Sequence, residues 1–154
     1  MKKVNILNFK KTLSMFSTGI TVVCVKNKKT IYGKTVNSFN SLSLNPPMVL
    51  FSLGNYSSSI NQFLKTKFLS INILSNKQKK LSANFASTTP KLENIDFIEG
   101  KNETVIIPDC IANLECELID KIKRGDHIIF ICKILELQSN DKLKPLVYFN
   151  SKYC

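Results

Sequence analysis

The stretch G-K-T-V-N-S-F-N-S-L-S-L-N-P-P, residues 33–47, decides how this chain of 154 residues is interpreted. It gathers small hydroxyl and amide side chains into one uncharged polar run: Thr35, Asn37, Ser38, Asn40, Ser41 and Ser43. Apolar, strand-like segments flank the run at residues 20–25 and 48–53. Hydroxyls and amides hydrogen-bond strongly without carrying charge. The run therefore predicts a site for a flat, polar, mostly neutral ligand between two buried strands.

Length and composition predict one soluble globular domain covering residues 1–154. The chain is 44% hydrophobic and 21% charged, which is ordinary for such a domain. No apolar run reaches the ~20 residues that a membrane span needs. Polar side chains interrupt the apolar N-terminal stretch at Asn5, Asn8, Lys10 and Lys11. We therefore expect no signal peptide, no membrane association and a cytoplasmic location.

The cysteines and the single histidine argue against a metal site. The cysteines are odd in number, widely spaced and without a C-x-x-C pair: Cys24, Cys110, Cys116, Cys132 and Cys154. Zinc-type spacing is absent. We expect no bound metal and free thiols that are mostly buried, with Cys154 exposed at the chain end.

The formal net charge of +11 raises the question of nucleic acid binding. Only Arg124 is an arginine, and the lysines are scattered without interleaved aromatic residues. A solvated basic surface is therefore favoured, and a basic nucleic-acid-binding β-barrel remains the disfavoured alternative. The positive field would still attract anionic dinucleotides.

Hydrophobic spacing predicts a mainly β protein with two or three short helices. Apolar runs and alternation predict strands at residues 20–25, 31–39, 48–53, 68–74, 112–118, 128–137 and 146–149. Helices are expected over residues 6–16, over 78–85, and after Ser59, which forms an S-x-x-Q capping box with Gln62. The polar run of residues 33–47 leads out of a strand as a loop. Because no βαβ rhythm appears, the pattern favours an antiparallel barrel.

Several segments follow one another in the order of a known family. They are F-S-T-G-I-T-V-V at 16–23, the polar run at 33–47, F-L-S-I-N-I-L at 68–74, A-N-F-A at 83–86, A-N-L-E-C-E-L at 112–118, G-D-H at 125–127 and P-L-V-Y-F at 145–149. Together they resemble the flavin reductase-like family, whose domains bind flavin on an antiparallel Greek-key split β-barrel. The resemblance runs over nearly the whole chain.

The resemblance implies an NAD(P)H-dependent flavin reductase. Such an enzyme transfers hydride from NADH or NADPH to FMN or FAD, as a homodimer, and supplies reduced flavin to a partner oxygenase. Neither the preferred nicotinamide nor the preferred flavin follows from the residues. The alternative is a non-catalytic flavin-binding electron carrier or sensor on the same fold.

The resemblance also assigns cofactor-binding residues. Thr35, Asn37 and Ser38 would line the flavin ring and ribityl chain, with Ser41 and Ser43 close by. The serines at the start of the helix after residue 59 would offer hydrogen-bond donors to the flavin phosphate: Ser57, Ser58 and Ser59. Any one of these hydroxyls could instead cap a loop or a helix.

The remaining candidates lie in the second half of the chain. Asn84 and Phe85 would border the flavin, although Phe85 suits the core equally well. His127, in G-D-H, would orient the nicotinamide or stabilise the charge of the reduced flavin; the alternative is a structural or exposed histidine. Tyr153 is the second candidate near the nicotinamide, unless the chain end is frayed. Hydride transfer needs orientation rather than a nucleophile or strong base.

Overall fold

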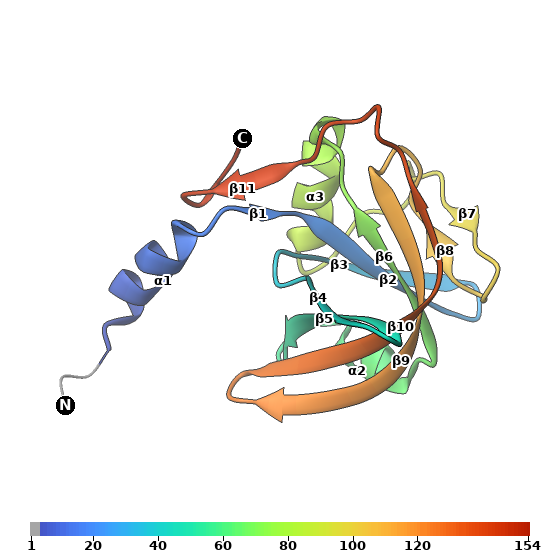
Figure 1. Cartoon of the computed structure of the whole chain (residues 1–154), viewed down its shortest axis with the longest axis horizontal. Helices are drawn as coiled ribbons and strands as arrows, with labels where there is room; N and C mark the ends of the chain where they lie inside the picture. Colours follow the sequence, from blue (N-terminus) through green and yellow to red (C-terminus); the bar gives the residue numbers. More distant parts are fainter. Residues whose placement is uncertain (1–3) are drawn as a thin grey trace.

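The computed structural model describes residues 4–154, and antiparallel strands dominate it (Figure 1). The main sheet has the order β3-β2-β6-β9-β10-β5-β4. Its strands, in chain order, are β2 Thr21–Asn27, β3 Thr30–Val36, β4 Asn40–Leu44, β5 Pro47–Gly54, β6 Phe68–Ile73, β9 Ala112–Arg124 and β10 His127–Ser139. The predicted mainly β, antiparallel fold is confirmed. The outermost strands β3 and β4 are not paired with each other, so the sheet does not close through backbone hydrogen bonds between strands.

Short elements complete the fold. Small sheets are formed by β1 Thr18–Gly19 with β11 Val147–Phe149 and β12 Lys152–Tyr153, and by β7 Ile98–Glu99 with β8 Val105–Ile106. The helices are α1 Ile6–Ser14, α2 Ile60–Lys65 and α3 Lys79–Ala86. A 3-10 turn, η1 Asn76–Gln78, immediately precedes α3. The predicted helices are thereby confirmed. Within residues 4–154, no helix is long and apolar enough to cross the hydrocarbon layer of a membrane.

One side of the sheet packs an aromatic core against α2. The rings of Phe51 and Phe130 stack with centroids 5.0 Å apart, and Phe63 of α2 meets both edge-on. All three side chains are fully buried. Aromatic pairs of this kind contribute about 0.5–1.5 kcal/mol beyond the area they bury. They hold α2 against β5 and β10.

The other side of the sheet packs against α3. Val22 and Cys24 of β2 face this second core, where Phe85 of α3 is fully buried. Because Val23 faces the aromatic core instead, β2 is buried on both faces. Such burial explains why residues 20–25 read as an unbroken apolar run rather than an alternating one.

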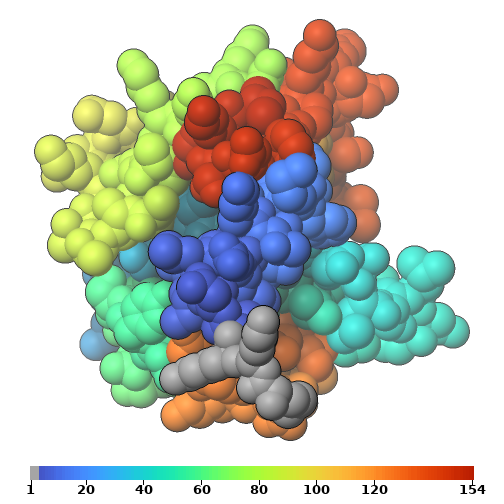
Figure 2. All heavy atoms as spheres, turned by 90° about the vertical axis from the view of Figure 1, so that its left-hand side faces the viewer, coloured from blue at the N-terminus to red at the C-terminus, as the bar shows by residue number. Residues whose placement is uncertain are grey.

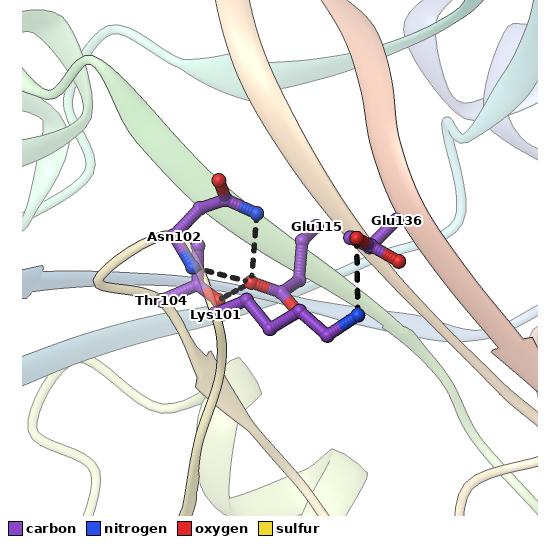
Figure 3. Close-up of polar contacts among 5 residues, drawn as sticks. All are labelled: Lys101, Asn102, Thr104, Glu115 and Glu136. Carbon is purple, nitrogen blue, oxygen red and sulfur yellow. Dashed lines mark hydrogen bonds and ion pairs between the residues drawn. The ribbon is translucent and has the colours of Figure 1, made fainter.

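A buried carboxylate fastens the loop between β7 and β8 to the sheet. One oxygen of Glu115, which is only 5% exposed, accepts hydrogen bonds from the backbone and side-chain amides of Asn102 and from the Thr104 hydroxyl (Figure 3). Burial alone would raise the pKa of Glu115, but these hydrogen bonds outweigh it and the pKa is lowered. Lys101 reaches past this group to Glu136 at 3.1 Å.

Helix α1 lies apart from both cores. Its N-cap residue Asn5 accepts hydrogen bonds from the backbone amides of Leu7 and Asn8. None of its residues is buried, and Ile6, Leu7, Phe9 and Leu13 are each more than half exposed. Figure 1 shows the helix projecting from the body, and Figure 2 shows it below the C-terminal segment and beside the protruding β4–β5 turn.

Two local predictions are wrong. Ser59 makes no side-chain cap hydrogen bond, and the amide of Gln62 pairs with Asn27, so no capping box starts α2. The capping box forms instead at Ser75 and Gln78, before η1. The expected loop after β3 also contains a strand, β4, because the backbone of β5 offers it an unpaired edge.

Candidate active site

A cleft of about 340 Å³ opens where the ends of several elements meet. Its walls come from the end of β3, the end of β5, the loop after β5, the segment after α3 and the first residue of β10. We call it the main cleft. Six predicted site residues line it: Thr35, Asn37, Ser38, Ser57, Ser58 and His127. The structure thus brings together residues that are up to 92 positions apart in the sequence.

The hydroxyls of Thr35 and Ser38 hold the walls of the main cleft in place. Thr35 donates a 2.7 Å hydrogen bond to the backbone carbonyl of Ser82 in α3. Ser38 donates to the carbonyl of Ser52 at 3.0 Å and accepts from its amide at 2.9 Å. Ser52 lies beyond the part of β5 that β4 covers. The Ser38 hydroxyl therefore replaces a missing strand partner at this edge.

Asn37 and the hydroxyls of Ser57, Ser58 and Ser87 are further polar groups at or near the main cleft. The Asn37 side chain is exposed in the cleft. Ser58 donates to the backbone carbonyl of Thr88 at 2.9 Å and so ties the loop after β5 to the segment after α3. The hydroxyls of Ser57 and Ser87 are buried without a hydrogen-bond partner. A buried unpaired hydroxyl costs free energy, which a polar ligand atom would recover.

Lys34 is the cation of the main cleft. Its ammonium donates to the Ser87 carbonyl at 2.7 Å. Partial burial lowers the pKa of Lys34. No aspartate or glutamate is among the residues that line the cleft. A bound anion would therefore meet a positive charge that no carboxylate in the lining neutralises.

His127 stands at the opposite wall, where β10 begins after the turn at Gly125 and Asp126. Its Nδ1 lies 2.7 Å from the Asp126 carboxylate. The hydrogen bond and charge of His127 lower the pKa of Asp126. An ionised carboxylate only accepts hydrogen bonds, so Nδ1 carries the proton and Nε2 is left for a ligand. The ring meets Tyr56 edge-on at 6.4 Å.

Six predicted residues do not line the main cleft: Ser41, Ser43, Ser59, Asn84, Phe85 and Tyr153. Ser41 and Ser43 lie on β4, on either side of a bulge. Ser59 lines a neighbouring cleft. Asn84 uses its side chain to bind both backbone groups of Lys91. Phe85 is fully buried in the core, which was the alternative left open.

Tyr153 is ordered on β12 rather than frayed. Its hydroxyl lies 2.9 Å from that of Ser82 in α3, and its ring meets Tyr148 edge-on. The same Ser82 residue accepts the hydrogen bond of Thr35 through its carbonyl. Tyr153 therefore supports the helix behind the cleft wall.

Sequence reasoning missed eight of the residues that line the cleft, among them Lys34, Tyr56 and Thr88. Lys34 stands inside the decisive run of residues 33–47, and that position was the available signal. It was passed over because lysines are abundant in this chain. Tyr56 and Thr88 carried no signal of their own.

The cysteines behave as expected. Cys24, Cys110, Cys116 and Cys132 are buried free thiols, whereas Cys154 is exposed. Burial raises the pKa of Cys110 to about 11 and that of Cys132 to about 12. Among residues 4–154, no three histidine, cysteine or acidic side chains are grouped as metal ligands.

Comparisons with known proteins show the family. Residues 13–154 match the flavin reductase like domain, and the chain belongs to this family. The protein "FMN reductase (NADH) SmoA" of Agrobacterium fabrum is 34% identical over 137 residues, which cover 89% of this chain and 79% of the relative. The reductase subunit HsaB of a flavin-dependent monooxygenase from Mycobacterium tuberculosis is 31% identical over 148 residues, covering 94% and 79%.

A solved structure agrees with these relatives. The structure of flavin reductase PheA2 in its native state superposes with a TM-score of 0.92 at 32% identity. The match covers 98% of this chain and 97% of that one. The similarity therefore extends over the whole main sheet and the main cleft.

Proposed function

We propose that this protein is an NADH-dependent flavin reductase whose main cleft binds the flavin. The observation that carries the proposal is the lining of the cleft: uncharged hydroxyl and amide groups, one lysine, one histidine and no carboxylate. This lining suits a neutral polar ring system joined to a phosphate. The family and the names of the relatives SmoA, HsaB and PheA2 support the same activity.

The chain's own residues divide the binding work. The hydroxyls of Thr35 and Ser38 are already hydrogen-bonded to Ser82 and Ser52. The groups that would contact the flavin ring are therefore the Asn37 side chain and the backbone around Thr35 and Ser38. The unpartnered hydroxyl of Ser57 and the ammonium of Lys34 suit the phosphate end. A bound flavin supplies the hydride acceptor for the nicotinamide.

His127 is proposed to orient the nicotinamide. Its Nδ1–H is held by Asp126, so the ring is fixed and Nε2 is available to accept a hydrogen bond from the carboxamide N–H of a nicotinamide. Fixing the donor against the acceptor is the main requirement for hydride transfer. Its side chain is 44% exposed, so a nicotinamide can approach it from solvent.

NADH oxidation with added FMN tests the activity. We expect turnover well above the flavin-free rate, and the absence of turnover with either NADH or NADPH would defeat the proposal. His127→Ala should lower kcat/KM for NADH about tenfold or more while flavin affinity is kept. His127→Asn, which retains a hydrogen-bonding group, should lose less. A purified protein that is yellow but turns over little would favour the electron carrier or sensor.

We also propose that the main sheet curls into a split barrel. The two hydrogen bonds between Ser38 and Ser52 support this, because they join the chain just after β3 to β5 near the opposite edge of the sheet. Distances between spin labels at Tyr32 and Leu44 distinguish a split barrel from a flat sheet. A flat sheet of this strand order holds its two edge strands far apart, so a short distance between the labels supports the split barrel.

A homodimer is proposed from the exposed apolar surface. Ile6, Leu7 and Phe9 of α1 are more than half exposed, and Leu44 beside β5 is 92% exposed. An amphipathic helix with no buried residue needs a partner surface. Light scattering should give twice the chain mass. Phe9→Lys should shift it toward the monomer, whereas Asn8→Lys, away from the face of Ile6, Phe9 and Leu13, should not. An oxygenase is the proposed consumer of reduced flavin, as the name of HsaB suggests.

A further inference from the structure

Tyr56 is an aromatic side chain of the main cleft to which the proposed function gives no role. It is the only phenylalanine or tyrosine among the residues that line this cleft. It is also 78% exposed, so its ring contributes little to the packing of the fold. Single exposed apolar side chains are common on protein surfaces. A role for Tyr56 therefore has to be argued from its placement.

The turn that carries Tyr56 is fastened to the residue that holds His127. The backbone amide of Asn55 donates a hydrogen bond to the backbone carbonyl of Asp126 at 2.9 Å. The carboxylate of the same Asp126 lies 2.7 Å from Nδ1 of His127. The rings of Tyr56 and His127 meet edge-on, with their centroids 6.4 Å apart. Asp126 thus fixes both rings relative to each other.

Gly54 leaves the space that the Tyr56 ring occupies. It is the last residue of β5, and it pairs with His127, the first residue of β10. A Cβ added at Gly54 would lie 2.8 Å from both Cε1 and Cζ of Tyr56, closer than the ~3.5–4.0 Å of a good carbon contact. A glycine within a strand often marks a place where another group approaches closely. Here the absence of a side chain lets the Tyr56 ring lie beside His127.

Hydride transfer changes the charge of the nicotinamide ring. The C4–H bond of the neutral dihydronicotinamide breaks, its electron pair and proton pass to N5 of the flavin, and the nicotinamide is left as a pyridinium cation. The face of an aromatic ring attracts a cation. No aspartate or glutamate is among the lining residues of the main cleft. The Tyr56 ring is therefore the side chain in this lining that offers the developing cation an aromatic face.

We propose that Tyr56 contacts the face of the nicotinamide that is turned away from the flavin and stabilises the positive charge that forms there during hydride transfer. The inference rests on the proposed function, because it assumes that the nicotinamide binds beside His127. Gly54 is a positioning residue, since it acts through the placement of Tyr56. Because the cation gains more from the ring than the neutral substrate does, losing the ring weakens NAD⁺ binding more than NADH binding.

Tyr56→Leu and Tyr56→Phe form a matched pair, because both are apolar and only the second keeps the ring. KM is measured for NADH, and inhibition constants are measured for NAD⁺ and for ADP-ribose, which lacks the nicotinamide. Tyr56→Leu should raise the inhibition constant of NAD⁺ about two- to fivefold, raise KM for NADH less, and leave ADP-ribose inhibition unchanged. Flavin reduction at saturating NADH should slow about two- to fivefold, since the charge forms in this step. Tyr56→Phe should behave as wild type does.

Gly54→Ala tests the positioning role. It should reproduce the weaker NAD⁺ inhibition of Tyr56→Leu, because the added Cβ displaces the ring. In the Tyr56→Leu background it should have no further effect, and additive losses would contradict the role of Gly54. FMN affinity and melting temperature should stay at the wild-type values in all of these variants, because Tyr56 is largely exposed.

Two results would overturn the proposal. One is unchanged NAD⁺ inhibition in Tyr56→Leu. The other is an equal change for NAD⁺, NADH and ADP-ribose, which would show that the ring does not distinguish the cationic nicotinamide. A wild-type protein without FMN turnover would instead refute the proposed function, so the two failures are distinguishable.

Discussion

Replacing Gly33 with alanine tests how closely α3 packs on β3 behind the main cleft. An added Cβ would lie 2.5 Å and 2.7 Å from the ring atoms Cε1 and Cδ1 of Phe85, and 3.3 Å from Sγ of Cys24. Carbon atoms in good contact are about 3.5–4.0 Å apart, so the ring must retreat by about 1 Å. Phe85 is fully buried, so its ring cannot retreat into solvent. Overpacking of this kind costs about 1–3 kcal/mol.

Urea unfolding measures this cost directly. Gly33→Ala should lower the unfolding midpoint, and its melting temperature should fall by about 2–4 °C for each kcal/mol lost. Gly19→Ala is the control, because nothing lies within 4 Å of its added Cβ. Phe85→Leu should cost less in the Gly33→Ala background than in wild type, since the smaller side chain relieves the clash. Equal midpoints for wild type and Gly33→Ala would refute this reasoning about α3.

Three further outcomes follow from the contacts described. Glu115→Gln should lose about 1–3 kcal/mol of folding stability at neutral pH. The pKa of Glu115 is lowered on folding, so the stability from its charge is present at neutral pH and is lost as the pH falls through the folded pKa. The urea midpoints of wild type and variant should therefore converge in acid. Ser38→Ala should lose about 1–2 kcal/mol by the same measurement, because both backbone groups of Ser52 lose their partner. With a thiol reagent, Cys154 should react first and the four buried cysteines only on unfolding.

Much of the sheet could be predicted because its pattern is local. The apolar run at 20–25 follows from the burial of both faces of β2. The alternation at residues 112–118 locates β9, but its polar side is also covered, because Asn113 and Glu115 are buried with hydrogen-bond partners. The turn after Arg124 was readable because Gly125 adopts a positive φ of 57°, which favours glycine. Such features depend on neighbours within a few residues, and the sequence records those neighbours directly.

β4 could not be predicted for the opposite reason. Its residues Asn40–Leu44 are mostly exposed and polar, with low strand propensity. They form a strand because β5 offers an unpaired edge. Ser41 and Ser43 lie in β4, where they pair with β5 on either side of a bulge, and for this reason they do not line the main cleft. Propensity carries no information about an edge supplied by another segment.

The roles of individual hydroxyls depend on which backbone groups the fold leaves unpaired. The polar run of residues 33–47 predicts a single ligand-binding segment. In the structure, however, the hydroxyls of Thr35 and Ser38 donate hydrogen bonds to backbone carbonyls of α3 and β5. Among the described residues, the buried hydroxyls left without partners are those of Thr18, Ser57, Ser59 and Ser87, which lie on three segments of the chain. Ser58 joins two of these segments by donating to the Thr88 carbonyl, and Lys34 of β3 donates to the Ser87 carbonyl beside it. A ligand site is therefore best inferred from the donors and acceptors that folding leaves unpaired. Here Ser57 lines the main cleft and Ser59 lines the neighbouring one.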